Sequence, residues 1–127
     1  MTQLSDLHPK RRWQSIKHAL AGWRLMLREE PNSWVHTIAT IAVIALGLAV
    51  GLQRWEWCLL VLAIGLVWSA EALNSAIESL ADRVTGDIDP AIKRVKDLAA
   101  AAVLCCALTA ALLGVLVFAP YLAAIIR

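Results

Sequence analysis

Charged residues are scarce in this sequence. Only 17% of its 127 residues are Asp, Glu, Lys or Arg, whereas 60% are hydrophobic, and the mean hydropathy is +0.65. A soluble domain of this length would not carry so many apolar residues, so the composition indicates a small membrane protein. The net charge is only +2, which gives no support to a nucleic-acid partner.

Cysteine is also rare. The three cysteines, Cys58, Cys105 and Cys106, all lie in apolar runs, and an adjacent pair points to different sides of a helix. We therefore interpret them as small hydrophobic residues rather than as a disulfide or a metal site. The N-terminal stretch is polar and basic and lacks an apolar segment with a cleavage site, so we expect no signal peptide.

An amphipathic helix is predicted over residues 10–29, because apolar residues recur there at spacings of three and four. Its apolar stripe consists of Trp13, Ile16, Leu20, Trp23 and Leu27. The rest of its surface carries Arg11, Arg12, Lys17, Arg24 and Arg28. A basic helix with tryptophan on its apolar side suits the membrane interface, so we expect a surface helix.

Three longer apolar segments predict membrane helices over residues 34–52, 55–85 and 97–119, within one membrane domain that spans residues 1–127. At about 1.5 Å per residue, the first segment nearly crosses a hydrocarbon core about 30 Å thick. Tryptophans near both of its ends are typical of membrane interfaces. The second segment is expected to extend into the cytoplasm.

Proline and glycine mark the predicted breaks. Pro31 separates the surface helix from the first membrane helix, and we expect Pro120 to end or kink the third. Gly47 and Gly51 form a pair of small residues that offers a seat for a neighbouring helix.

The basic residues predict the orientation. Of the twelve Lys and Arg, ten lie in the N-terminal helix or between residues 83 and 96, and the exceptions are Arg54 and Arg127. Because cytoplasmic segments carry an excess of Lys and Arg, this distribution places the N-terminus and the 83–97 segment in the cytoplasm. Three spans then place the C-terminus outside.

A polar face runs down the second membrane helix. Glu71, Asn74, Glu78 and Asp82 fall within a sector of about 80° on a helix, and the face contains no basic residue. A carboxylate near membrane depth is energetically costly and usually marks function. The alternative is an ordinary amphipathic helix end with solvated charges.

These carboxylates suit phosphoryl transfer. Glu30, Glu71 and Glu78 converge at the predicted cytoplasmic interface, where two carboxylates and phosphate oxygens suit Mg²⁺. Glu71 lies deepest and is positioned to take a proton from a lipid hydroxyl, while Lys96 and the N-terminal arginines face nucleotide phosphates. The sequence contains no Walker A or glycine-loop motif, so any nucleotide site is of another kind.

The sequence resembles the small prokaryotic diacylglycerol kinase and undecaprenol kinase family over about residues 11–120. The resemblance rests on E-x-x-N-S-A-I-E-x-x-x-D from Glu71 to Asp82 and on K-D-x-A-x-A-A-V from Lys96 to Val103. S-x-x-H-A-x-x-G from Ser15 and E-x-N from Glu30 are similar to its N-terminal motifs. The resemblance implies a homotrimer in the bacterial cytoplasmic (inner) membrane that uses MgATP to phosphorylate a lipid alcohol.

Carried over residue by residue, the resemblance assigns roles in the site. Glu71 would be the catalytic base, and Glu30 and Glu78 would hold the metal. Independently of the resemblance, the apolar stripe of the surface helix is expected to cover the lipid with Ile16, Leu20 and Trp23. The nucleotide-binding residues would be Arg11, His18, Glu30, Asn74, Glu78, Asp87, Asp89, Lys96 and Asp97.

Some positions depart from the diacylglycerol kinase pattern of enteric bacteria. His18 stands in place of a tyrosine and His36 in place of a glutamate, and we interpret His36 as a packed or interfacial residue. Glu56-Trp57 and the ending at Pro120 look more like the undecaprenol kinase branch, whereas the Asp87–Asp89 segment is unlike either branch.

Two alternatives remain open. The acceptor lipid is either undecaprenol or diacylglycerol, and a kinase specific for diacylglycerol alone is the first alternative. A non-catalytic ion-binding or channel subunit is the second, and it would need polar residues through the membrane. The first and third spans contain almost none, which counts against this alternative.

Overall fold

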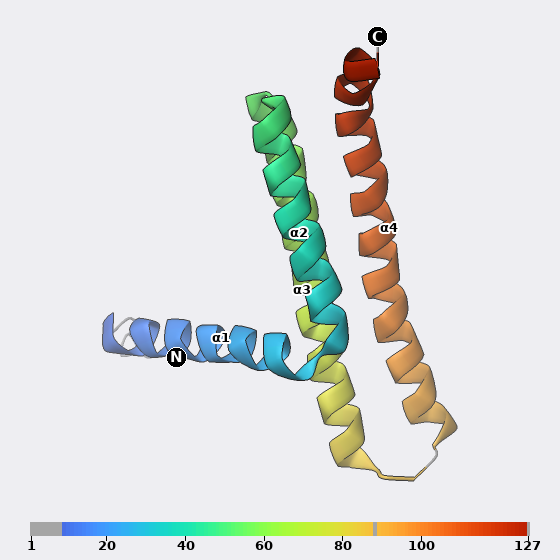
Figure 1. Cartoon of the computed structure of the whole chain (residues 1–127). Coiled ribbons are helices and arrows are strands. Elements are labelled where there is room, and N and C mark those ends of the chain that lie inside the picture. The colour runs from blue at the N-terminus through green and yellow to red at the C-terminus, as the bar shows by residue number, and fades with distance from the viewer. Residues whose placement is uncertain (1–8, 88, 127) are drawn as a thin grey trace, which may run out of the picture.

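A computed structural model describes residues 9–87 and 89–126, and it describes side chains from Arg12 onward. Within these residues the chain folds into α1 (Pro9–Glu29), α2 (Pro31–Val50), α3 (Arg54–Val84) and α4 (Pro90–Ile126), without strands. The predicted all-α architecture is confirmed. Figure 1 shows α2, α3 and α4 running alongside one another while α1 projects sideways from them.

Three of these helices are long and apolar enough to cross a membrane, as predicted: α2 with 20 residues, α3 with 31 and α4 with 37. At about 1.5 Å per residue they are about 30, 46 and 56 Å long, so α3 and α4 exceed a hydrocarbon core of about 30 Å. The ends of α3 and α4 that are joined by their connection extend past the level of α1 (Figure 1).

The helix bounds differ from the predicted ones at prolines. Pro31 and Pro90 are the first residues of α2 and α4, a position where the missing N–H has no partner to lose. The helix α4 does not end at Pro120 but continues through it to Ile126. Proline is tolerated inside membrane helices because neighbouring groups satisfy the freed backbone carbonyl.

Glu30 forms the corner between α1 and α2. It has extended backbone angles, φ −101° and ψ 112°, and is the single non-helical residue between the two helices. The buried Ser33 stabilises this corner, since its Oγ lies 2.7 Å from the carbonyl oxygen of Glu30 and 3.2 Å from that of Met26. One hydroxyl therefore holds the end of α1 against the start of α2.

Gly51 forms the opposite turn, between α2 and α3. It adopts a left-handed conformation with φ 71°, which glycine reaches without steric cost, and its N–H donates to the carbonyl of Gly47. A Cβ on Gly47 would lie 2.9 Å from both Leu52 and Trp57. The predicted seat for a neighbouring helix is therefore covered at Gly47 by the same chain.

A buried carboxylate ties the far end of α4 to this turn. Glu56 Oε2 accepts a hydrogen bond from the backbone N–H of Gln53 at 2.7 Å and another from the Tyr121 hydroxyl at 2.5 Å. Beside it, Leu52, Leu60, Val117 and Phe118 form a small buried apolar cluster. This end of the molecule is therefore well packed.

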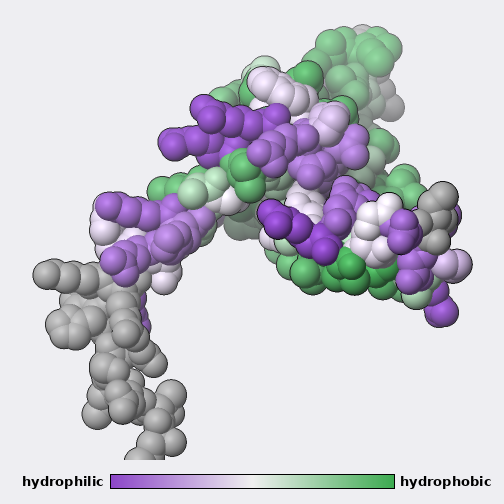
Figure 2. All heavy atoms as spheres, turned by 90° about the horizontal axis from the view of Figure 1, so that it is seen from below, coloured by the Kyte–Doolittle hydropathy of each residue, from purple (hydrophilic) through white to green (hydrophobic). Residues whose placement is uncertain are grey.

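Most large apolar side chains of α2 and α4 are exposed, as expected for helices that face lipid or other membrane helices. Hydrophilic side chains instead gather at the end that carries α1 and the α3–α4 connection, which Figure 2 shows in purple against the green apolar surface behind it. The three cysteines are free.

Candidate active site

The deeper part of the polar face of α3, Glu71 and Asn74, is turned inward, whereas Asp82 and the apolar side of the helix are exposed. Glu71 is only 1% exposed and Asn74 8%, but Leu73 and Leu80 are 65% and 66% exposed. This is the reverse of a helix on a soluble protein and suits a helix surrounded by lipid or other apolar helices. This burial excludes the alternative of a solvated charge for Glu71.

Asn74 and Glu78 are joined one helical turn apart. The Asn74 Nδ2 group donates a hydrogen bond to Glu78 Oε1 at 3.3 Å. Within the described part of the chain, two buried side-chain oxygens, Asn74 Oδ1 and Ser75 Oγ, have no hydrogen-bond partner. A buried oxygen without a partner is costly, so these atoms are available to a ligand that supplies a proton or a positive charge.

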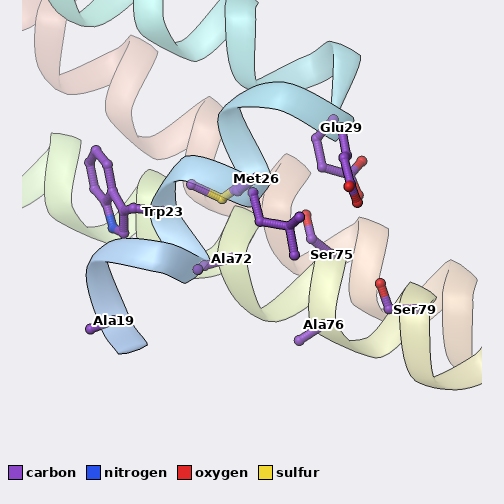
Figure 3. A pocket seen from close by; sticks show the side chains of 11 residues that line it. Ala19, Trp23, Met26, Glu29, Ala72, Ser75, Ala76 and Ser79 are labelled. Atoms are coloured by element: carbon purple, nitrogen blue, oxygen red, sulfur yellow. The ribbon is translucent and has the colours of Figure 1, made fainter. Parts of the chain in front are cut away.

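A cavity of about 280 Å³ lies between α1 and α3 near these residues. Figure 3 shows Trp23 and Met26 of α1 facing Ala72 and Ser75 of α3, with Glu29 and Ser79 further along. Glu30 also lines the cavity. The walls are therefore mainly apolar, with carboxylates and hydroxyls at one end.

Two further carboxylates act on Glu71 in this region. Glu30, at the α1–α2 corner, and Glu78, two turns along α3, both interact electrostatically with Glu71. Both lie near enough to Glu71 for their charges to act on it, and the convergence of all three at one metal site stays a prediction. Mutual repulsion of buried carboxylates is relieved by a cation or by donors between them.

The donors fit a hard cation. Glu30, Glu78 and the free Asn74 Oδ1 are oxygen ligands, which Mg²⁺ prefers, and the ion usually takes its other ligands from water and phosphate. Among the residues described, no group of three or more His, Cys, Asp or Glu side chains is arranged to hold a metal alone. The set therefore suits an ion that arrives with a phosphate ligand.

The family model of the prokaryotic diacylglycerol kinases matches residues 17–118. The chain belongs to this family. It is 38% identical over 110 residues to an undecaprenol kinase of Bacillus subtilis, covering 87% of this chain and 89% of that protein. It is 33% identical over 101 residues to a diacylglycerol kinase of Synechocystis sp., covering 79% of this chain and 58% of that protein.

Membership identifies the protein as a membrane lipid kinase. The buried Glu71 and the carboxylates near it are therefore candidates for catalytic roles. A kinase of this family requires surfaces for a nucleotide and a lipid. The candidate residues for both surfaces are distributed over α1, the α1–α2 corner, α3, the α3–α4 connection and the first turns of α4.

Lys96 joins α3 and α4 next to the connection between them. Its Nζ lies 2.7 Å from Asp82 Oδ1, and it also interacts electrostatically with Glu78. Asp97 is exposed and pairs instead with Lys93 at 2.6 Å. Of these two neighbours, only Lys96 is therefore directed toward the acidic face of α3.

Asp89 has a structural role that the sequence analysis missed. Its Oδ1 accepts hydrogen bonds from the backbone N–H groups of Ala91 at 2.7 Å and Ile92 at 3.4 Å, which makes it the N-cap of α4. The signal was the Asp89-Pro90 dipeptide, an N-cap residue followed by proline at the first helical position. Asp87 lies in the same connection, where its N–H donates to Thr85 Oγ1 at 3.0 Å.

The remaining predicted residues lie on α1. Ile16, Leu20 and His18 are exposed, and Trp23 is partly covered by its stack on Trp68, with ring centroids 5.0 Å apart. The side chain of Arg11 is outside the described residues. Ser75 and Ser79, which line the cavity, were also missed; their spacing of four on α3 was the available signal.

Proposed function

We propose that this lipid kinase transfers the γ-phosphate of ATP to the primary hydroxyl of a lipid alcohol, with Mg²⁺ bound alongside the nucleotide. The observation that carries the proposal is the burial of Glu71 beside Glu30, Glu78 and the unpartnered Asn74 oxygen. A deep carboxylate next to an oxygen-rich metal site is the combination that phosphoryl transfer to an alcohol needs.

In the proposed reaction, Glu71 accepts the proton of the acceptor hydroxyl while the hydroxyl oxygen attacks the γ-phosphorus. The bond from the γ-phosphorus to the bridging oxygen breaks, and ADP leaves with that oxygen. Glu30, Glu78 and Asn74 would hold the metal, which would supply charge neutralisation on the phosphate oxygens. Lys96 adds a positive charge near the same phosphates.

The two acceptor lipids share a primary hydroxyl at the membrane interface. We favour undecaprenol, because the undecaprenol kinase relative aligns with most of this chain, whereas the chain covers little more than half of the diacylglycerol kinase relative. Diacylglycerol as the sole acceptor is the second candidate.

The proposal includes a topology and an assembly. The N-terminus and the α3–α4 connection lie in the cytoplasm, where ATP is present, and the basic residues at that end support this orientation. The protein is a closed homotrimer in the bacterial inner membrane. The outer half of α1 projects beyond α3, which supports contact between its exposed stripe and another subunit (Figure 1).

The decisive experiment supplies radiolabelled ATP, Mg²⁺ and an equimolar mixture of undecaprenol and diacylglycerol to the purified protein in bilayers. We expect labelled lipid phosphate that disappears with EDTA, with undecaprenol competing on equal or better terms. Exclusive labelling of diacylglycerol would establish the second candidate. No ATP consumption with either lipid would support a non-catalytic ion-binding subunit instead.

A further inference from the structure

A histidine on α2 faces the proposed base. His36 Nε2 lies 3.7 Å from Glu71 Oε2, and both side chains are largely buried. The mechanism proposed above does not use His36, for which the sequence pattern indicated a packed or interfacial residue. Its position opposite the carboxylate shows that this interpretation is incomplete.

A tryptophan between the helices holds the histidine in place. The buried Trp68 meets the His36 ring edge to face, with centroids 6.2 Å apart and an interplanar angle of 66°. The Trp68 Nε1 group donates to Thr40 Oγ1 at 3.1 Å, one turn beyond His36 on α2. The register between α2 and α3, and with it the placement of His36, is therefore fixed by a buried aromatic contact and a hydrogen bond.

The electrostatics of Glu71 create a need for such a partner. Glu30 and Glu78 both repel the Glu71 carboxylate, and burial removes it from water. A buried carboxylate requires a hydrogen-bond donor or a positive charge close by. Within the part of the chain that the structure describes, the His36 ring nitrogen is the side-chain nitrogen that lies within 4 Å of a Glu71 oxygen.

We propose that His36 is a positioning residue for Glu71: its Nε2–H donates to one carboxylate oxygen and aims the other at the acceptor hydroxyl. The inference rests on the proposed role of Glu71 as the base. The present 3.7 Å separation exceeds a hydrogen bond, and such contacts often tighten only when substrates bind. During the reaction the imidazole keeps its proton, and the hydroxyl proton passes to the free oxygen of Glu71.

The test compares His36→Leu with His36→Gln in the full-length protein in bilayers. Glutamine carries an N–H donor near the position of Nε2, whereas leucine fills similar space without one. We expect His36→Leu to lower kcat about 10- to 100-fold, the range for a lost hydrogen bond to a charged group, with both KM values unchanged within about twofold. His36→Gln should recover most of kcat.

A polar-to-apolar control, Thr109→Val, alters an exposed hydroxyl on α4 and should leave kcat unchanged. Equal kcat losses in His36→Leu and His36→Gln would overturn the inference, because the lost property would then be packing. A rise in KM without a fall in kcat would also overturn it.

The Glu71→Gln variant separates this inference from the proposed function. If His36 acts through Glu71, adding His36→Leu to Glu71→Gln should cost little more activity, because the two losses are not additive. Retained activity in Glu71→Gln would remove the proposed base and the inference together. An inactive Glu71→Gln with a fully active His36→Leu would overturn only the role of His36.

Discussion

Trp23 of α1 stacks on Trp68 of α3, with ring centroids 5.0 Å apart and planes inclined by 25°. The same Trp68 contacts His36 and donates to Thr40 of α2, so one side chain joins three helices. The surface helix is thereby attached to the helix that carries Glu71. The attachment lies at the cavity between these two helices, which Trp23 itself lines.

Replacing Trp23 with alanine should loosen α1. A stacked aromatic pair contributes about 0.5–1.5 kcal/mol beyond the burial of its area. We expect the variant to raise the lipid KM more than it lowers kcat, and to speed tryptic cleavage at Arg24 and Arg28. Trp13→Ala is the control, because Trp13 is exposed further along the same helix and contacts Lys17. Equal cleavage rates in the two variants would contradict the anchoring role of the stack.

Replacing Glu71 or Glu78 with glutamine should impair different steps of the reaction. Glu71→Gln should lower kcat about 10²- to 10⁴-fold with nearly intact nucleotide binding, because only proton transfer is lost. Glu78→Gln should raise the Mg²⁺ requirement or weaken nucleotide binding, because a metal ligand is lost. Steady-state kinetics at varied Mg²⁺ and direct nucleotide titration measure both effects. An equal loss of nucleotide binding in the two variants refutes the division of roles.

Each active site should contain parts of two subunits. The test mixes two inactive variants, Ile16→Gln on α1 and Glu78→Leu on α3, and measures kinase activity after subunit exchange. In a closed trimer, every mixed ring has one interface with intact parts from both sides, so roughly a quarter of the wild-type activity should return. No recovery after confirmed exchange would mean that each site lies within one chain, as the cavity between α1 and α3 also permits.

Loss of the Ser33 hydroxyl should disturb the position of Glu30. Ser33→Ala removes the contacts of Oγ with the carbonyl oxygens of Glu30 and Met26, at a cost of about 1 kcal/mol. We expect a lower Tm in detergent and a higher MgATP KM. Thr37→Val serves as the control, since it removes a similar bond to the Ser33 carbonyl but leaves the contacts of Ser33 with Glu30 and Met26 in place. The same KM change in both variants would argue against a specific effect on Glu30.

The part-buried hydrogen bond between Tyr121 and Glu56 should contribute to the free energy of unfolding without affecting kcat. Tyr121→Phe removes the hydroxyl that donates to Glu56 at 2.5 Å, and hydrogen bonds to charged groups contribute about 1.5–3 kcal/mol. Denaturant unfolding should report a loss in this range, with kcat unchanged. A double-mutant cycle with Glu56→Gln isolates the pair, and additive losses would show that the two side chains are not coupled.

The sequence alone determined the helices and the acidic face. Hydropathy and the spacing of apolar residues predicted an amphipathic helix and three membrane helices, because these patterns depend only on neighbours along the chain. The spacing of Glu71, Asn74 and Glu78 placed them on one face for the same reason. Helix ends were less predictable, since a proline such as Pro120 is compatible with a continuing helix when tertiary contacts or neighbouring side chains allow it.

Only the tertiary structure decided which faces meet. His36 and Glu71 belong to different helices, so no local pattern predicts that their side chains oppose each other. The same holds for Lys96 with Asp82, whose pairing depends on how α3 and α4 pack. The direction in which the polar face of α3 points is also set by packing. Burying Glu71 is costly unless neighbouring helices supply its partners, and those partners are chosen by the register between helices.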